Sequence, residues 1–334
     1  MRVLGWTERE EPARVYIAGT EDGRFVEFVE SVEPPIPREE KWVLIVSTLF
    51  GCPVRCLFCD AGGSYAGPLD ARSILFQIDR MVRARYPAGS VPAGKFKVQF
   101  ARMGEPALND AVLEVLEELP ARYDAPGLMP ALSTIAPAGR EGFFERLLDI
   151  RRRLYGPRFQ LQFSIHSTDR SVRDRLVPAP KWDLAGIASY GERFHVEGGR
   201  KIALNFALEE SSPLDPGVLL RHFDPERFMV KITPVNPTLR ARESGLESGV
   251  DPETGGAPAA DALRLAGYDV IVSVGELEEN RIGSNCGQLL DAWLSSGRRL
   301  EGGYGERIVR PAEEGPRNSP KTLSGSGAGS GATG

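Results

Sequence analysis

Three cysteines, Cys52, Cys56 and Cys59, stand close together in the segment GCPVRCLFCDAGG. Thiolates are favoured ligands of iron–sulfur clusters. The C-x3-C-x2-C spacing predicts a short loop that wraps three corners of a cuboidal [4Fe–4S] cluster. The fourth iron then has no protein ligand, so it is free to accept an external one, such as the amino and carboxylate groups of S-adenosylmethionine (SAM).

A structural zinc site is the alternative for the same triplet. Such a site takes four protein ligands, and Cys286 or His166 would have to supply the fourth. Structural zinc motifs usually come as two close pairs of ligands, whereas this chain has one triplet and a distant cysteine. The spacing therefore favours the cluster, and four cysteines so distributed do not indicate a disulfide framework.

From residue 41 onward, strand-like apolar runs alternate with helical patterns, which predicts an α/β fold with a parallel sheet or barrel. The predicted strands are Lys41–Ser47, Lys95–Phe100, Pro130–Thr134, Phe159–Ser164, Lys201–Phe206, Phe228–Thr233 and Asp269–Val274. The predicted helices are Ala71–Tyr86, Asp110–Arg122, Gly139–Leu154, Asp183–His195 and Pro216–Phe223. Ahead of them, alternating residues around a turn predict a hairpin over Ala13–Glu30.

We expect three regions: a hairpin extension with its connector (1–40), the strand–helix region (41–300) and a C-terminal extension (301–334) that ends in a disordered Gly/Ser tail. In strand–helix folds, ligand-binding groups lie at the carboxyl ends of the strands. Polar motifs follow five of the predicted strands: the cysteine loop, Gly104-Glu105, Ser133-Thr134, Ser164 with His166, and Asn236. The sequence therefore predicts one binding site at this rim.

Five segments downstream of the cysteine loop carry a family resemblance. They are MGEPALN (103–109), LST (132–134), FSIH with RDRLVP (163–166, 173–178), ITPVNP (232–237) and NCGQL (285–289). With the triplet, they resemble the radical SAM superfamily and, within it, the ribosomal RNA adenine methyltransferases, over about residues 24 to 290. The resemblance implies a partial (β/α)6 barrel.

It also implies what each motif does. In that family, the cluster receives an electron from a donor such as flavodoxin or ferredoxin and cleaves SAM to methionine and a 5′-deoxyadenosyl radical. Gly104 and Glu105 would meet the methionyl amino group of SAM, where a carboxylate accepts charge-assisted hydrogen bonds. The rest of SAM would be lined by Ser133, Ser164, Ile165, His166 and Asn236.

Two further residues have catalytic roles by resemblance. Cys286 would carry a methyl group taken from one SAM before a second SAM supplies the radical; otherwise it is an ordinary buried free cysteine. Glu27 is the best positional match for the family's general base, with Glu30 nearby, although most glutamates in a hairpin are merely solvated.

The chain departs from the family at Ile45, which occupies the position of a second mobile cysteine. With three cysteines on the cluster and Cys286 as the carrier, no thiol remains for a disulfide-forming resolution step. Only 51 residues precede Cys52, and a hairpin, a connector and a strand account for them, so we expect no accessory RNA-binding domain. The net charge of −5 and pI near 5.5 also provide no global basic field for nucleic acid.

We therefore predict a radical SAM methyltransferase-like enzyme whose substrate is a small molecule, nucleotide or peptide, with RNA disfavoured. The alternatives are a radical SAM enzyme that performs a non-methylating rearrangement or ring closure, a ribosomal or transfer RNA adenosine C-methyltransferase, and a non-catalytic iron–sulfur or zinc protein. Apolar stretches are too short for a membrane span, and the charged start over 1–11 is unlike a signal peptide, so we expect no membrane partner and a cytoplasmic location.

Overall fold

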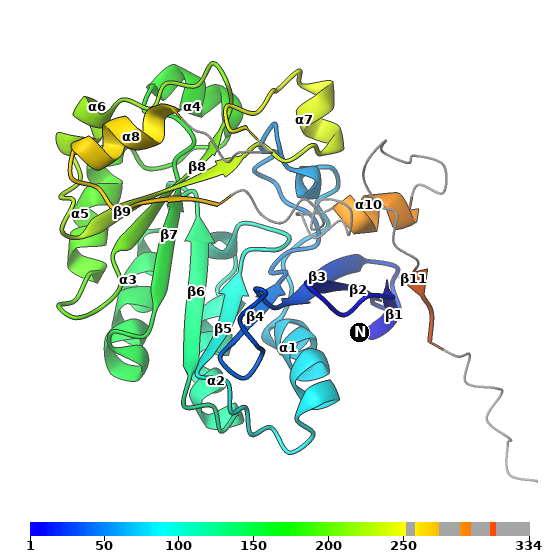
Figure 1. Cartoon of the computed structure of the whole chain (residues 1–334). Coiled ribbons are helices and arrows are strands. Elements are labelled where there is room, and N and C mark those ends of the chain that lie inside the picture. The colour runs from blue at the N-terminus through cyan, green and yellow to red at the C-terminus, as the bar shows by residue number, and fades with distance from the viewer. Residues whose placement is uncertain (252–257, 274–287, 295–307, 312–334) are drawn as a thin grey trace, which may run out of the picture.

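The computed structural model describes residues 1–251, 258–273, 288–294 and 308–311. A single sheet runs through these residues in the strand order β10-β9-β8-β7-β6-β5-β4-β3-β2-β1-β11 (Figure 1). Neighbours from β4 to β10 are parallel, and those from β4 back to β1 and on to β11 are antiparallel. The strands are β1 Arg2–Thr7, β2 Ala13–Gly19, β3 Phe25–Ser31, β4 Lys41–Val46, β5 Lys95–Phe100, β6 Leu128–Thr134, β7 Gln160–Ser164, β8 Ile202–Leu208, β9 Phe228–Pro234, β10 Val270–Val272 and β11 Ile308–Val309.

Strand β5 shows how the sequence orients the sheet. Its apolar residues Phe96, Val98 and Phe100 are fully buried, whereas the alternate residues Lys95, Lys97 and Gln99 are partly exposed on the opposite side. This period of two gives the sheet an apolar outer side, along which helices pack, and a polar inner side that lines the lumen of the open barrel.

Amphipathic helices cover the outer side (Figure 1). They are α1 Ala71–Arg85, α2 Ala111–Arg122, α3 Glu141–Ile150, which continues into a π-helical turn over Arg151–Tyr155, and α5 Leu184–Phe194. Helix α1 begins where the Asp70 side chain accepts the backbone N–H of Ser73 at 2.7 Å, an ordinary N-cap. The remaining helices are short: η1 Asp60–Gly62, η2 Pro106–Leu108, α4 Arg170–Leu176, α6 Pro216–Leu220, α7 Leu239–Glu243, α8 Pro258–Leu265 and α10 Gln288–Leu294.

The predicted α/β fold and the N-terminal hairpin are confirmed. Lys95–Phe100 is observed with the predicted bounds, and the other predicted strands are shifted by at most a few residues. Strand β1 was not predicted; it pairs with β2 and turns the hairpin into a three-stranded unit. Helices α4 and α7 were also missed, because segments this short carry little periodic signal. The end of the last predicted strand, Val274, lies outside the described residues.

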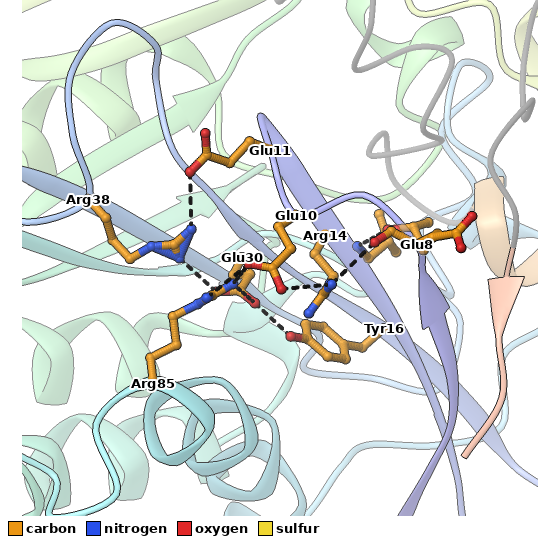
Figure 2. A network of polar contacts seen from close by, with 10 residues as sticks. Glu8, Glu10, Glu11, Arg14, Tyr16, Glu30, Arg38 and Arg85 are labelled. Carbon is orange, nitrogen blue, oxygen red and sulfur yellow. Dashed lines mark hydrogen bonds and ion pairs between the residues drawn. The ribbon is translucent and has the colours of Figure 1, made fainter. Parts of the chain in front are cut away.

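The N-terminal strands continue the main sheet, since β3 pairs with β4. A buried polar network also fixes them to α1 (Figure 2). At its centre the carboxylate of Glu30, 1% exposed, accepts hydrogen bonds from the Tyr16 hydroxyl at 2.6 Å and from Arg85 Nε at 2.8 Å, and pairs with Arg38 Nη1 at 3.4 Å.

In the part of the chain that is described, no helix combines the length and apolar character needed to cross a bilayer.

Candidate functional site

The cysteine loop leaves the carboxyl end of β4 and is closed at its base. The buried amide of Asn109 donates to the carbonyl oxygens of Thr48, at 2.8 Å, and Leu69, at 2.7 Å, so one side chain joins both ends of the loop. The backbone N–H of Thr48 donates to the carbonyl of Met103 at 2.8 Å. The cysteine loop and the MGEP segment after β5 therefore form one unit at the rim.

None of the three thiols is in a disulfide; Cys52 is buried, and Cys56 and Cys59 are partly buried. Burial raises the pKa of Cys52 to about 11, and the charge of Glu105 adds to the increase, while backbone N–H groups, that of Val54 first, oppose it. Burial and the charge of Cys52 likewise raise the pKa of Cys56. Within the described ranges, no three His, Cys, Asp or Glu side chains are gathered around a common point that would hold a single metal ion.

Glu105 lies buried at the ends of β5 and β6. One carboxylate oxygen accepts the N–H of Ala107 at 3.1 Å and the hydroxyl of Thr134, and the other accepts the N–H of Ile135 at 2.9 Å. Burial raises the pKa of Glu105 to about 7, and these hydrogen bonds oppose the increase. The buried thiols and this buried carboxyl would all be stabilised in their charged forms by cationic groups, so the donor set fits an iron cluster and an ammonium group.

Gly104, directly before Glu105, has a backbone conformation that favours glycine. Its φ is +97°, and a Cβ added there would lie 2.5 Å from the side chain of Leu49. A larger residue would therefore push the MGEP segment away from the cysteine loop.

His166 joins the end of β7 to the cysteine loop. Its Nδ1 accepts the backbone N–H of Ala207 at 3.0 Å, and its ring lies 4.6 Å, between centroids, from that of Phe58. Burial, together with the charges of Arg173 and Lys181, lowers the pKa of His166 to about 3, so the ring is neutral at ordinary pH. Next to it, the N–H of Ile165 donates to the Asn205 carbonyl at 2.8 Å.

Three other predicted SAM-lining residues lie at the same rim. Ser133, near the end of β6, accepts a hydrogen bond from the Gln162 amide at 3.2 Å, Ser164 ends β7, and Asn236 follows β9. All three are partly exposed. The structure thus brings the loops after β4, β5, β6, β7 and β9 to one edge of the sheet, as the sequence predicted.

Asp60, which the sequence analysis did not single out, clamps the cysteine loop to the segment after β9. Its two carboxylate oxygens accept the N–H groups of Leu239, at 3.1 Å, and Arg240, at 2.9 Å, at the start of α7. The Thr238 hydroxyl donates in return to the Phe58 carbonyl at 3.0 Å. The only sequence signal was an aspartate directly after the last cysteine, because its partners lie about 180 residues downstream.

Glu27 lies on β3 with its side chain fully buried, not solvated. Its carboxylate pairs with Arg102 at 2.6 Å and accepts the N–H of Leu290, in the first turn of α10, at 2.7 Å. Arg102, directly before the MGEP motif, was not predicted. Cys286 lies outside the described residues; it precedes Leu290 by four positions in the sequence.

Ile45 lies within β4, where it pairs with Val29 on one side and Gln99 on the other. The position at which the resembling family has a mobile cysteine is therefore part of the barrel wall in this chain.

Comparison with known proteins gives a consistent result. No protein-family model matches the chain. It is 28% identical over 209 residues to the dual-specificity RNA methyltransferase RlmN of Wolinella succinogenes, a match that covers 59% of this chain and 55% of that protein. It is 26% identical over 298 residues to a probable dual-specificity RNA methyltransferase RlmN of Chlorobaculum tepidum, with 85% and 75% covered.

The chain thus spans about half the length of the first curated relatives it matches. Among solved structures, a radical SAM methyltransferase from Sphaerobacter thermophilus shares the fold, with a TM-score of 0.63 at 20% identity, covering 86% of this chain and 80% of that one. Radical SAM methyltransferases use a [4Fe–4S] cluster and SAM. In sequence the chain is thus similar to the dual-specificity RNA methyltransferases RlmN, and it shares the fold of a radical SAM methyltransferase.

Proposed function

We propose that the chain is a radical SAM methyltransferase that transfers a methyl group to carbon through Cys286, on a substrate other than ribosomal RNA. Cys52, Cys56 and Cys59 would hold the [4Fe–4S] cluster, which supplies reductive cleavage of SAM when both are bound. The observation that carries the proposal is the rim: the cysteine loop is joined directly to the Glu105 segment and to the segment after β9.

Each of the chain's own rim residues has a distinct task in this proposal. Gly104 permits the close approach that aims Glu105, whose carboxylate would accept the methionyl ammonium of SAM. Because burial raises the pKa of Glu105, a neighbouring ammonium would favour its ionised form. Ser133, Ser164 and Asn236 would present partly exposed polar groups to the rest of SAM, whereas Ile165 and the neutral His166 would form a buried, uncharged part of the site.

Glu27 is supported as a residue that serves the Cys286 segment. Its buried carboxylate holds the first turn of α10, four residues after Cys286 in the sequence. As the general base it would take a proton from the methylated substrate.

Two observations bear on the substrate. The chain carries Ile45 in a β-strand, which leaves no second mobile thiol in the wall, and its net charge is negative. Both favour a small molecule, nucleotide or peptide over large structured RNA, with a flavodoxin or ferredoxin as the electron donor. The second candidate is C-methylation of an adenosine in RNA, favoured by the names of the relatives.

Anaerobic incubation of the reconstituted protein with SAM and dithionite tests the chemistry. We expect 5′-deoxyadenosine, S-adenosylhomocysteine and a Cys286 peptide heavier by one methylene group. A Cys286→Ala variant should still form 5′-deoxyadenosine but no S-adenosylhomocysteine. If wild-type protein yields 5′-deoxyadenosine alone and an unmodified Cys286, the enzyme performs a non-methylating radical reaction; with neither product, the enzyme proposal fails.

Ribosomal and transfer RNA fragments test the second candidate. The main proposal expects neither binding at low salt nor label transfer from methyl-labelled SAM to these RNAs. Transfer of label to adenosine would establish the RNA activity instead and overturn the substrate assignment.

A further inference from the structure

A cavity of about 180 Å³ lies between the cysteine loop, the turn that joins β2 to β3, and α10. Helix α10, drawn in orange in Figure 1, contacts η1 of the cysteine loop as well as β2 and β3. Three segments that are distant in the sequence therefore meet around this cavity. We call it the loop pocket; among the residues that line it are Arg24, Phe50, Ala66, Met103, Leu290 and Leu294.

The buried side of the loop pocket is held by Glu27. The backbone N–H of Glu27 donates to the Met103 sulfur at 3.4 Å, and the Glu27 carboxylate accepts the N–H of Leu290 at 2.7 Å. Met103 precedes Glu105 by two positions, and Leu290 follows Cys286 by four. The pocket therefore adjoins the segments to which the proposed methyl transfer assigns its roles.

Two walls of the pocket are fixed by contacts within the protein. The Phe50 ring is almost fully buried, and the guanidinium of Arg24 lies 4.4 Å from its centroid. Arg24 Nε donates in turn to the Asp22 carboxylate at 2.9 Å, which holds the guanidinium in place. On the opposite strand of the loop, the N–H of Ala66 donates to the Phe50 carbonyl at 2.8 Å. The pocket is thus formed before a ligand enters it.

The side chains of these walls suit an aromatic ring. Ring faces, guanidinium planes and thioether sulfurs all make favourable contacts with aromatic rings, and Phe50, Arg24 and Met103 supply one of each. The Asp60 carboxylate also lines the pocket, but its two oxygens already accept the N–H groups at the start of α7. The lining therefore favours an apolar ring over a nucleobase, whose edge needs polar partners.

Exposed apolar side chains gather at the same place. Leu294 lines the pocket and is 54% exposed, and Tyr65, between the lining residues Ser64 and Ala66, is 47% exposed. Only five large apolar side chains are this exposed in the described part of the chain, so two of them stand at one pocket. Exposed apolar groups that adjoin a cavity are typical of a ligand site.

The size of the pocket limits what it can hold. An apolar cavity of about 150 Å³ is large enough for benzene. The 180 Å³ of the loop pocket therefore accommodates one ring but not a whole nucleotide.

We propose that the loop pocket binds a single phenyl-type ring carried by the substrate. That the ring belongs to the substrate rests on the proposed methyl transfer, because the pocket adjoins Glu27 and the segment after Cys286. Binding of a ring requires neither the cluster nor Cys286, so it can be measured separately.

The probe is 4-fluorobenzyl alcohol, an uncharged single ring, titrated against the full chain and followed by fluorine NMR. Wild type should show saturable binding at one site. Ala66→Trp fills the pocket from an exposed position and should abolish this binding. Ala121→Trp, at an exposed alanine of α2, is the matched control and should bind as wild type does.

Competition tests the choice of ring. Unlabelled benzyl alcohol should displace the probe at concentrations about three- to tenfold lower than cyclohexylmethanol or adenine, because neither competitor offers an apolar aromatic ring. Equal displacement by either competitor would overturn the assignment to a phenyl-type ring.

A second variant covers the case in which Ala66→Trp does not fold, which thermal unfolding would reveal. Leu294→Gln removes an exposed apolar wall and should weaken probe binding about three- to tenfold. Absence of saturable binding by wild type, or wild-type binding by both pocket variants, would overturn the proposal.

The mass of the Cys286 peptide separates this proposal from the proposed function. A methylated Cys286 in a protein that does not bind the probe would contradict the pocket assignment alone. Probe binding by a protein whose Cys286 stays unmodified would contradict the methyl transfer, and with it the assignment of the ring to its substrate, but not the ring site.

Discussion

The carboxylate of Glu27 and the guanidinium of Arg102 form a 2.6 Å ion pair in which both side chains are almost completely buried. Glu27 belongs to β3, and Arg102 follows β5 directly ahead of the MGEP motif. Since Glu27 also holds Leu290, the pair connects the N-terminal strands, the rim and α10. A single buried carboxylate thus fixes three segments that are distant in sequence.

Replacing Glu27 with Gln should lower the free energy of unfolding by about 3–5 kcal/mol, because the charge of Arg102 then stays buried opposite a neutral amide. Adding Arg102→Met to that variant should lower the free energy of unfolding far less than Arg102→Met does in the wild-type protein. Urea unfolding of all four proteins gives the coupling energy, with the exposed Glu21→Gln as a control near zero. Strictly additive effects would contradict the ion pair.

Replacing Tyr16 with Phe removes one hydrogen bond to the buried carboxylate of Glu30 (Figure 2). Because hydrogen bonds to charged groups contribute more than neutral ones, we expect a loss of about 1.5–3 kcal/mol in the free energy of unfolding. Tyr65→Phe, at an exposed tyrosine, should leave stability unchanged. Equal stability of the two variants would show that the hydroxyl of Tyr16 contributes nothing.

The neutral ring of His166 makes stability depend on pH in a defined direction. In unfolded chains a histidine has a pKa near 6.5, whereas burial lowers the pKa of His166 to about 3. The neutral ring therefore makes its full contribution to the free energy of unfolding above pH 6.5. This contribution is lost as the pH falls from 6.5 toward 3. Relative to His166→Asn, wild type should lose about 3 kcal/mol between pH 7 and pH 4. A His166 resonance that titrates between pH 5 and pH 8 would refute this.

Replacing Asp60 with Ala should release α7 from the cysteine loop, because both carboxylate contacts to the start of the helix are lost. We expect a loss of about 1–2 kcal/mol, as for other helix caps, and faster bleaching of the reconstituted cluster in air. Asp183→Ala removes the cap of the outer helix α5, where Asp183 accepts the N–H of Gly186 at 2.8 Å. The Asp183→Ala variant should lose a similar amount of stability without a change in the bleaching rate of the cluster. Equal bleaching rates in the two variants would contradict a specific role for Asp60.

Much of the parallel sheet could be predicted, because strands that are covered by helices on one side are short runs of similar length that are rich in apolar residues. The rim followed from one topological rule, that the carboxyl ends of parallel strands meet, applied to polar motifs such as Gly104-Glu105. Both inferences use information that is local in the sequence.

The contacts that hold the rim together were not predictable in the same way. Asp60 has its partners near residue 240, and Asn109, at the end of the MGEPALN segment, joins both ends of the cysteine loop. Glu27 was matched by its position in the sequence to the general base of the resembling family. Its burial, however, follows from the packing of α10 on β3, which no pattern in the hairpin encodes. Such pairings are set by tertiary packing, which local propensity does not specify.

The closure of the cysteine loop by Asn109 has a consequence for the order of events in biogenesis. A loop whose two ends are already joined has lost most of its closure entropy before any metal arrives. We therefore expect the polypeptide to fold before a cluster is inserted, so that an iron–sulfur delivery protein would meet three thiols on a folded scaffold.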